Sequence, residues 1–374
     1  MLYNKHNFRR LALRSLTVCS RLAMFATIAC GLAFAAAPPV ADTAATQAAG
    51  ISPTLAHVRA AGVLRCGIDQ EEAEYSTSGD HGNREAFDAD LCRAVAVATL
   101  GKNALVQVTH YPDDHTAMNG LQAGEVEMVA TLSDDFTHSA ETRLRFTRPI
   151  LWDGVGFLVP GGSPVQRARQ LSGKKICFLA ETAVEESVRA WFAREHLDFV
   201  PFPFQEEGEM QAAFATGNCG ALAGDRTRLA ETRAALEQHG KRARLLQEII
   251  SQDPLAAAVR NDDPQWAVIV NWVMEALVQA EESGVTRANV QAVRLRSAQA
   301  NGGDPVLRFL LGASGEMGGP LGLDDDWAVR VIEATGNYGE IYERDLGSAS
   351  PMKLPRGENN LREHGGALTA LPFK

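Results

Sequence analysis

One succession of segments occurs twice along this chain. In the first copy, strand-like and helix-like patterns follow one another in VLRCGI (63–68), FDADLCRAVAVATLG (87–101), HTAMNGLQAG (115–124) and VEMVA (126–130). The order strand, helix, helix, strand returns in KKICFLA (174–180), TAVEESVRAWFARE (182–195), EMQAAFATG (209–217) and CGALAGD (219–225). In each copy a glycine, Gly124 or Gly217, ends the second helix. The repetition predicts an α/β chain with two similar lobes.

Two short apolar segments, 153–160 (DGVGFLVP) and 253–260 (DPLAAAVR), border the second copy. We predict that they are strands that cross from one lobe to the other and back. Two crossings predict a two-strand hinge with a cleft beside it. The helical pattern of 264–284 then returns the chain to the first lobe, and Asn271 and Glu275 within it argue against a membrane span.

The first 37 residues have the composition of an export signal. They contain five Lys and Arg residues and no acid, and an apolar stretch follows from Leu22. Small residues offer cleavage after Ala35, Ala37 or Ala41. The alternatives are a permanent membrane anchor, which the short Ala-rich stretch argues against, and a lipid-modified Cys30. We therefore expect export to the periplasm.

Charge excludes two classes of partner. Without residues 1–37 the chain keeps 31 Lys and Arg against 46 Asp and Glu, a formal net charge of -15. An exported protein this acidic is not expected to bind nucleic acid or an anionic membrane.

Four cysteines remain outside the signal: Cys66, Cys92, Cys177 and Cys219. An even number in an oxidising compartment favours two disulfides, and the absence of a CxxC spacing argues against tetrahedral zinc. Three connectivities are open. The simplest one keeps each bridge inside a lobe, Cys66 with Cys92 and Cys177 with Cys219.

Several of these segments also carry a resemblance. The most specific is the tail GLDDDWAVRVIEATGNYGEIYERDLG (322–347), and RCGI, DADLCRAVAVA, LQAGEVEMV and DPLAAAVRNDDPQWAVIVNW add to it. Over residues 55–365 the chain resembles the periplasmic solute-binding proteins of ABC importers, specifically their general L-amino-acid-binding branch.

The resemblance implies a bilobed periplasmic-binding-protein fold that closes on one amino acid and presents it to an inner-membrane permease. We expect a first lobe at 55–155, a second lobe at 156–254, and a return to the first lobe with a C-terminal extension at 255–374. A monomer without metal or cofactor is expected.

The resemblance also implies which residues bind the ligand. In the family an arginine of a T-x-S-R pattern meets the ligand carboxylate, but here Thr137 and Ser139 precede Ala140. Thr182 lies where a hydroxyl residue of the second lobe assists, at a helix start that favours anions. Asp225 lies where a carboxylate meets the ligand ammonium.

The remaining pocket positions depart from the family pattern. Tyr75 resembles the aromatic residue that packs on the ligand, but Glu74 and Glu181 stand where the family usually has glycine. Arg143 or Arg145 is an alternative partner for the carboxylate in a shifted register.

Acids are numerous near the expected cleft: Asp69, Glu71, Glu72, Glu74, Asp134, Asp135, Glu181 and Asp225. Without the arginine, such a lining favours a basic amino acid or an amine over glutamate or aspartate. The alternative is that most of these acids face solvent, as acids in loops usually do.

Three other functions compete with solute binding. A dehydratase is known on a similar fold, and Glu71, Glu74 or Glu181 could serve it as an acid or base, but no nucleophile elbow or phosphate loop supports an enzyme. Asp69, Glu71, Glu72, Glu74 and Asp80 could bind a hard metal ion, without the spacing of an EF-hand. The missing arginine is also compatible with a binding-defective relative that senses or binds a partner. We expect a binding protein and not an enzyme.

Overall fold

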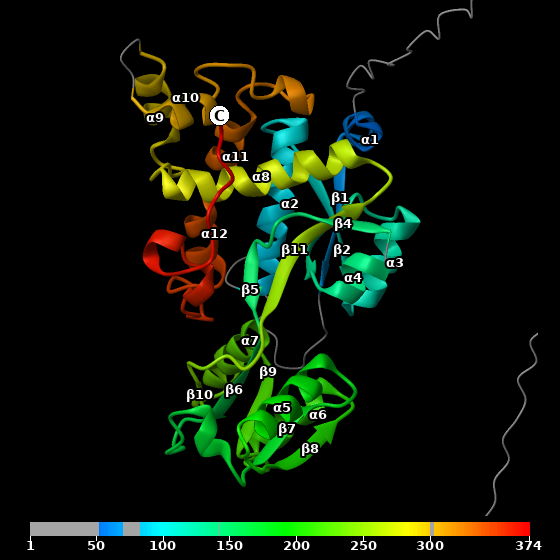
Figure 1. Cartoon of the computed structure of the whole chain (residues 1–374), viewed down its shortest axis with the longest axis vertical. Helices are drawn as coiled ribbons and strands as arrows, with labels where there is room; N and C mark the ends of the chain where they lie inside the picture. The colour runs from blue at the N-terminus through cyan, green and yellow to red at the C-terminus, as the bar shows by residue number, and fades with distance from the viewer. Residues whose placement is uncertain (1–51, 70–82, 142, 300–302) are drawn as a thin grey trace, which may run out of the picture. The chain divides into compact units, whose positions relative to one another are not determined.

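The computed structural model describes residues 52–69, 83–141, 143–299 and 303–374, without the side chains of Asp69 and Glu141. The predicted export signal and Tyr75 lie outside these residues. Two separate sheets organise the described chain (Figure 1). No helix in these ranges has the length and apolar character that a membrane span requires.

The first sheet has the strand order β2-β1-β3-β11-β4, and β5 pairs with the opposite end of β11 from β4. Its strands are β1 (Val63–Asp69), β2 (Leu105–Tyr111), β3 (Met128–Ser133), β4 (Leu144–Phe146), β5 (Leu151–Asp153) and β11 (Asp253–Arg260). β1 runs parallel to β2 and β3, whereas β11 is antiparallel to its neighbours. The second sheet has the order β10-β6-β9-β7-β8, with β6 (Val155–Pro160), β7 (Lys175–Leu179), β8 (Val200–Phe204), β9 (Ala221–Asp225) and β10 (Ala243–Leu245).

The helices fall into two groups, each of which packs on one sheet either directly or through other helices of the same group. The first group is α1 (Pro53–Ala61), α2 (Arg84–Leu100), α3 (Asp114–Ala123), α4 (Phe136–Glu141), α8 (Pro264–Glu282), α9 (Val290–Ser297), α10 (Pro305–Leu310), α11 (Trp327–Thr335) and α12 (Tyr338–Asp345). The second group is α5 (Ala183–Arg194), α6 (Glu207–Ala215) and α7 (Arg226–Gln238). The twofold α/β organisation predicted from the repeated segments is confirmed.

Local signals explain where the predicted helices begin and end. Gly124 ends α3 with a φ of 78°, a left-handed conformation that glycine adopts without steric cost. Thr182 caps α5, accepting a hydrogen bond from the backbone N–H of Glu185 at 3.4 Å. α2 begins before the predicted residue 87, because the Asn83 side chain caps it by accepting from the backbone N–H of Ala86 at 2.8 Å.

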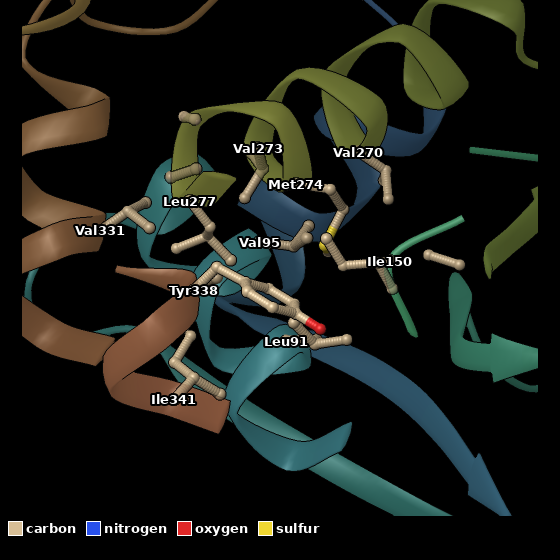
Figure 2. Close-up of a cluster of buried hydrophobic side chains, with 14 of the residues drawn as sticks. Leu91, Val95, Ile150, Val270, Val273, Met274, Leu277, Val331, Tyr338 and Ile341 are labelled. Carbon is tan, nitrogen blue, oxygen red and sulfur yellow. The ribbon is translucent and has the colours of Figure 1, made fainter. Parts of the chain in front are cut away.

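The core of the first group joins distant parts of the chain (Figure 2). Leu91 of α2, Met274 and Leu277 of α8, and Tyr338 and Ile341 of α12 are all buried in one hydrophobic cluster. Their burial explains why the tail at 322–347 folds with the first lobe. Full burial of each such side chain contributes ~1.5–3 kcal/mol.

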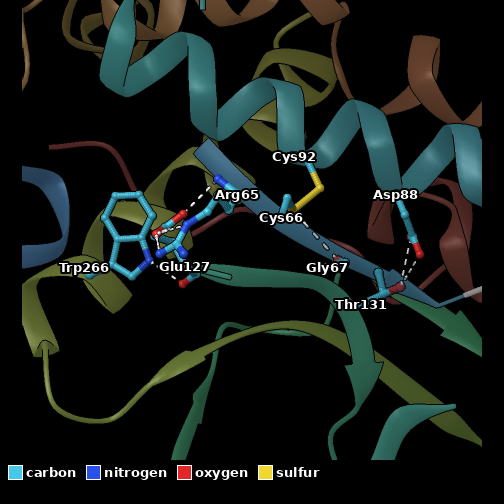
Figure 3. Close-up of a disulfide and its surroundings, with 8 residues drawn as sticks. All are labelled: Arg65, Cys66, Gly67, Asp88, Cys92, Glu127, Thr131 and Trp266. Carbon is cyan, nitrogen blue, oxygen red and sulfur yellow. Dashed lines mark hydrogen bonds and ion pairs between the residues drawn. A yellow bond between two sulfur atoms is a disulfide. The ribbon is translucent and has the colours of Figure 1, made fainter. Parts of the chain in front are cut away.

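The structure joins Cys66 to Cys92 and Cys177 to Cys219. The first disulfide fastens β1 to α2, as Figure 3 shows. The second fastens β7 to the residues that lead into β9. Each disulfide therefore lies within one α/β unit.

The crossings between the sheets differ in part from the prediction. Asp153 belongs to β5 of the first sheet and Val155 begins β6 of the second, so the first crossing is at Gly154. Residues 253–260, predicted as a crossing strand, are instead β11, which pairs with β3, β4 and β5 of the first sheet. That prediction was wrong, because the apolar residues of this segment are those of a central strand with neighbours on both sides.

The two crossings approach each other closely at Gly154. Its φ is 151°, and a Cβ atom at this position would lie 2.3 Å from the carbonyl oxygen of Ser251. The Ser251 hydroxyl accepts a hydrogen bond from the backbone N–H of Val155 at 3.0 Å. Only glycine fits this conformation at such a contact.

Candidate functional site

A cavity of about 440 Å³ lies among residues of both α/β units. Small-molecule sites usually enclose ~300–1,000 Å³. The second sheet and its helices supply apolar residues, Val155, Leu179, Val184, Met210, Leu222 and Leu229, and also the polar residues Thr182, Ser187, Glu207, Asp225, Arg228 and Thr232. The first unit and the crossings supply the polar residues Asp114, Ser133, Asp135, His138, Ser251 and Asp253.

A smaller cavity of about 170 Å³ shares five of its residues with the larger one: Asp114, Ser133, Asp225, Arg228 and Asp253. Its other lining residues are Arg84, Thr131, Asp153, Thr227 and Leu255. Leu255 is the one apolar residue among them. The two cavities together therefore offer a polar compartment next to a largely apolar one.

Asp253 lines both compartments where β11 begins. The Ser133 hydroxyl donates a hydrogen bond to its carboxylate at 3.1 Å. Burial raises the pKa of the Asp253 carboxyl to about 6, and the negative charges of Asp153 and Asp114 add to the rise. A carboxyl with this pKa changes charge in the mildly acidic range.

Arg84 enters the smaller cavity from the first turn of α2. Its Nε donates to Asp88 at 3.3 Å, and its guanidinium also donates to the hydroxyl of Thr131 at 2.5 Å. Thr131 in turn donates to the Asp88 carboxylate at 2.9 Å, and Figure 3 shows this pair. Asp88 is fully buried, and burial raises the pKa of its carboxyl while Arg84 opposes that rise.

The two α/β units also meet at the start of α2. The backbone N–H of Arg84 donates to the carboxylate of Glu231, on α7, at 2.9 Å. An acid at a helix N-terminus is favourable because the first N–H groups have no partner within the helix. This contact holds α7 next to Arg84.

Two of the predicted ligand-binding residues line the larger cavity. They are Thr182, at the start of α5, and Asp225, which ends β9 immediately before α7. The Thr182 hydroxyl also donates to the carbonyl of Leu179 at 2.9 Å. The structure therefore brings together the two candidates that the second lobe was expected to supply.

The candidates from the TxSA segment lie elsewhere. Thr137, Ser139 and Ala140 are exposed on α4 and line neither cavity. The neighbouring Asp135 and His138 do line the larger cavity, and the Asp135 carboxylate lies 3.0 Å from the His138 Nδ1. A role for Thr137 and Ser139 in binding stays a prediction.

The suggested substitutes for the missing arginine also lie outside both cavities. Arg143 is exposed. Arg145 is exposed on β4 and donates to the Asn261 side chain at 3.1 and 3.2 Å. Tyr75, Glu71, Glu72 and Glu74 lie outside the described residues, as does the Asp69 side chain.

Sequence reasoning did not identify Arg84, Arg228, Asp114 or Asp253 as site residues. A partial signal was present at Arg228, which follows Asp225 by three residues and therefore shares a helical face with it. Arg84 has a partner four residues away, Asp88, but that spacing indicates only a pair within one helix. Its other partners, Thr131 and Glu231, are 47 and 147 residues away along the chain.

A further cavity of about 560 Å³ is lined by residues of the crossings and of the C-terminal segment 354–359. Two of its polar side chains, Arg356 and Asn359, have partners in the protein. The Arg356 guanidinium donates to Glu281, and the Asn359 side chain exchanges two hydrogen bonds with the backbone of Trp152. This cavity is a weaker candidate for a charged solute.

The described residues contain no group of three or more His, Cys, Asp or Glu side chains that could hold a metal ion. The acidic stretch considered for metal binding lies largely outside those residues.

The chain is similar to known periplasmic binding proteins over most of its length. The general L-amino acid-binding periplasmic protein AapJ of Rhizobium johnstonii is 36% identical over 343 residues, which cover 91% of this chain and 98% of the relative. The glutamate/glutamine/aspartate/asparagine-binding protein BztA of Rhodobacter capsulatus is 35% identical and covers 90% of this chain and 97% of its own.

A solved structure shares the fold. The ABC transporter periplasmic binding protein from Brucella ovis, with glutathione bound, matches with a TM-score of 0.73 and 34% identity, over 86% of this chain and 99% of that chain. The family model of bacterial extracellular solute-binding proteins, family 3, matches residues 64–288. The α/β units, the cavity between them and these matches agree, and the chain belongs to the bacterial extracellular solute-binding proteins, family 3.

Proposed function

We propose that the protein is the periplasmic substrate-binding component of an amino-acid ABC importer. It captures one free amino acid between a lobe formed by 55–155 with 255–374 and a lobe formed by 156–254. It then delivers the ligand to an inner-membrane permease. Residues 1–37 direct export, and the mature protein acts as a monomer without catalysis.

The observation that carries this proposal is the composition of the two adjoining cavities. Asp225 and Thr182 come from the second unit, and Ser133 and Asp114 come from the first. A zwitterion needs counter-groups for both its charges, because burying either charge alone costs several kcal/mol. The relatives named for amino acids support this assignment.

The charge of the cavities supports a neutral or basic amino acid. Six acids line them, Asp114, Asp135, Asp153, Glu207, Asp225 and Asp253, against the two arginines Arg84 and Arg228. This excess of negative charge attracts cations and repels acidic side chains. In this proposal Asp225 holds the ligand ammonium, Thr182 contacts the ligand from the start of α5, and Tyr75, Thr137 and Ser139 add contacts from the first lobe.

A small peptide is the second candidate ligand. The Brucella ovis relative has glutathione bound at 34% identity to this chain. The apolar compartment next to the polar one offers room for more than a small side chain. Glutathione therefore belongs in any ligand screen.

A thermal-shift screen of the protein purified from the periplasm tests the proposal. The panel is the twenty standard amino acids, putrescine, spermidine and glutathione. A ligand at a hundred times its dissociation constant adds ~2.7 kcal/mol of stability, which raises the Tm by several degrees. N-terminal sequencing of the same sample tests removal of the signal.

Asp225→Ala should abolish the shift. The matched control is Asp262→Ala, because the Asp262 side chain is 71% exposed and lines neither cavity. A rise in Tm with glutathione and with no amino acid would indicate that the ligand is a small peptide. No shift with any compound would contradict the proposal and favour a relative that senses or binds a protein partner.

A further inference from the structure

Ala140 leaves open which group neutralises the carboxylate of the proposed ligand. Ala140 is exposed on α4, away from both cavities. Among the described residues that line the cavities, the guanidinium groups are those of Arg84 and Arg228. Arg84 lies on α2 of the first α/β unit, and Arg228 lies on α7 of the second.

We propose that Arg228, assisted by Arg84, holds the ligand carboxylate in the smaller cavity. The inference rests on the proposed function and adds a binding residue to it. Carboxylate recognition then belongs mainly to α7 of the second unit, instead of the α4 segment of the first.

One face of α7 carries both charged groups that the ligand needs. Asp225 immediately precedes the helix, and Arg228, Leu229 and Thr232 follow it at spacings of three, four and seven residues. All four line the larger cavity, as expected for residues on one helical face. Side chains one turn apart lie ~5–6 Å from one another at Cβ. Asp225 and Arg228 can therefore hold the ammonium and the carboxylate of one amino acid.

The two adjoining cavities differ in polarity, because the smaller one is lined almost entirely by polar residues. The smaller cavity is lined by both arginines, by three hydroxyl residues and by four aspartates, so it offers partners for an anionic and for a cationic group. The hydroxyl residues are Thr131, Ser133 and Thr227, and the aspartates are Asp114, Asp153, Asp225 and Asp253. The larger cavity adds the apolar side chains of Met210 and Leu222. A dipolar head group fits the first compartment, and the ligand side chain fits the second.

Buried acids anchor the two arginines in place. Arg84 donates to Asp88 and Thr131 and also contacts Glu231 through its backbone N–H. Arg228 attracts the carboxylates of Asp88 and Glu231, which opposes the rise that burial causes in the pKa of each. A guanidinium has donors on several sides, so anchoring to an acid is compatible with bidentate binding of a carboxylate.

The same anchoring defines the competing explanation, in which Arg228 only compensates the buried acids. The two explanations differ in what the residue does to ligands with and without a carboxylate. Calorimetry is therefore carried out with three pairs of probes: L-lysine and L-lysinamide, L-arginine and L-argininamide, and L-glutamine and L-glutaminamide. Each amide keeps the ammonium and the side chain but has no carboxylate.

The wild-type protein should bind at least one amino acid ~10–100-fold more tightly than its amide, because a charge-assisted pair is lost with the carboxylate. Arg228→Gln should remove most of that preference and leave the affinity for the amide within about twofold. Arg228→Lys keeps the positive charge but not the two-donor geometry of the guanidinium. Its preference for the amino acid over the amide should lie between those of wild type and Arg228→Gln. Arg194→Gln is the matched control, because Arg194 is exposed on α5 and lines neither cavity.

Two variants guard against a simple failure to fold. Arg228→Gln combined with Glu231→Gln keeps the network balanced in charge, and Arg228→Lys keeps the positive charge. If Arg228→Gln retains the full preference for the amino acid, the inference is overturned and the proposed function stands. Where the thermal-shift screen identifies another amino acid, that amino acid and its amide serve as the pair of probes. If wild-type protein binds no amino acid of either set, the inference and the proposed function fail together.

Discussion

The Asp153 carboxylate accepts hydrogen bonds from the backbone N–H groups of Arg226 and Thr227, at 3.0 and 3.3 Å, and so caps α7. It also accepts from the Thr227 hydroxyl and from the backbone N–H of Gly154 at 2.8 Å. Asp153 ends β5 of the first sheet, whereas α7 packs on the second. One side chain thus joins the two units at the crossing, next to the proposed binding residues.

Asp153→Asn should destabilise the protein by ~2–3 kcal/mol, because an amide offers one acceptor oxygen where the carboxylate offers two charged ones. Urea unfolding with matched m-values measures the loss. Asp262→Asn, at a side chain that is 71% exposed, should change stability by less than about 0.5 kcal/mol. Equal effects of the two substitutions would contradict the role of Asp153.

Asp253 predicts how stability depends on pH. Its carboxyl has a pKa of about 6 in the folded protein against an ordinary value of 3.8. The native protein therefore retains a proton that the unfolded chain releases between these values. The stability that this group contributes is complete below pH ~4 and is lost as the pH rises through about 6, at most about 3 kcal/mol.

Asp253→Asn should flatten the stability profile between pH 4 and 6. The measurement is the free energy of unfolding in urea at half-unit steps of pH, for wild type, Asp253→Asn and the exposed control Asp262→Asn. A wild-type slope that survives Asp253→Asn would assign the effect to another group.

Glu181 has a φ of 60°, in the left-handed region that favours glycine. Glu181→Gly should stabilise the folded protein by up to about 1 kcal/mol, because the Cβ atom is strained there. Thermal and urea unfolding test this. Glu186→Gly, in the first turn of α5, should instead cost ~1 kcal/mol. Destabilisation by Glu181→Gly would mean that its side chain makes a favourable contact that outweighs the strain.

Each disulfide should contribute ~3–4 kcal/mol in the chain-entropy model, with sequence separations of 26 residues for Cys66–Cys92 and 42 for Cys177–Cys219. Replacing either pair by alanine should lower the urea midpoint accordingly. Wild-type protein unfolded with and without dithiothreitol is the comparison. A loss below about 1 kcal/mol for one pair would show that its unfolded state stays compact without the bridge.

The elements that were predicted correctly depend on neighbours in the sequence. Gly124 and Thr182 delimit α3 and α5 through contacts with residues at most four positions away. The prediction that 253–260 crosses between the lobes was wrong, because an apolar strand has the same sequence pattern in a sheet interior and at a crossing. Its ladders with β3 and β4 are formed by residues more than 100 positions away, which no local pattern encodes.

The sequence by itself determined that this chain forms two α/β units, because helix caps, glycine stops and hydrophobic period act over a few residues. Thr182 and Asp225 were predicted from the resemblance to a known family, and they line one cavity. The tertiary structure decided which charges meet there. Arg84 and Arg228 line one cavity, and Glu231 of α7 caps the start of α2 beside it. Electrostatic interactions depend on distance in space, and the fold alone sets that distance for residues so far apart in the chain.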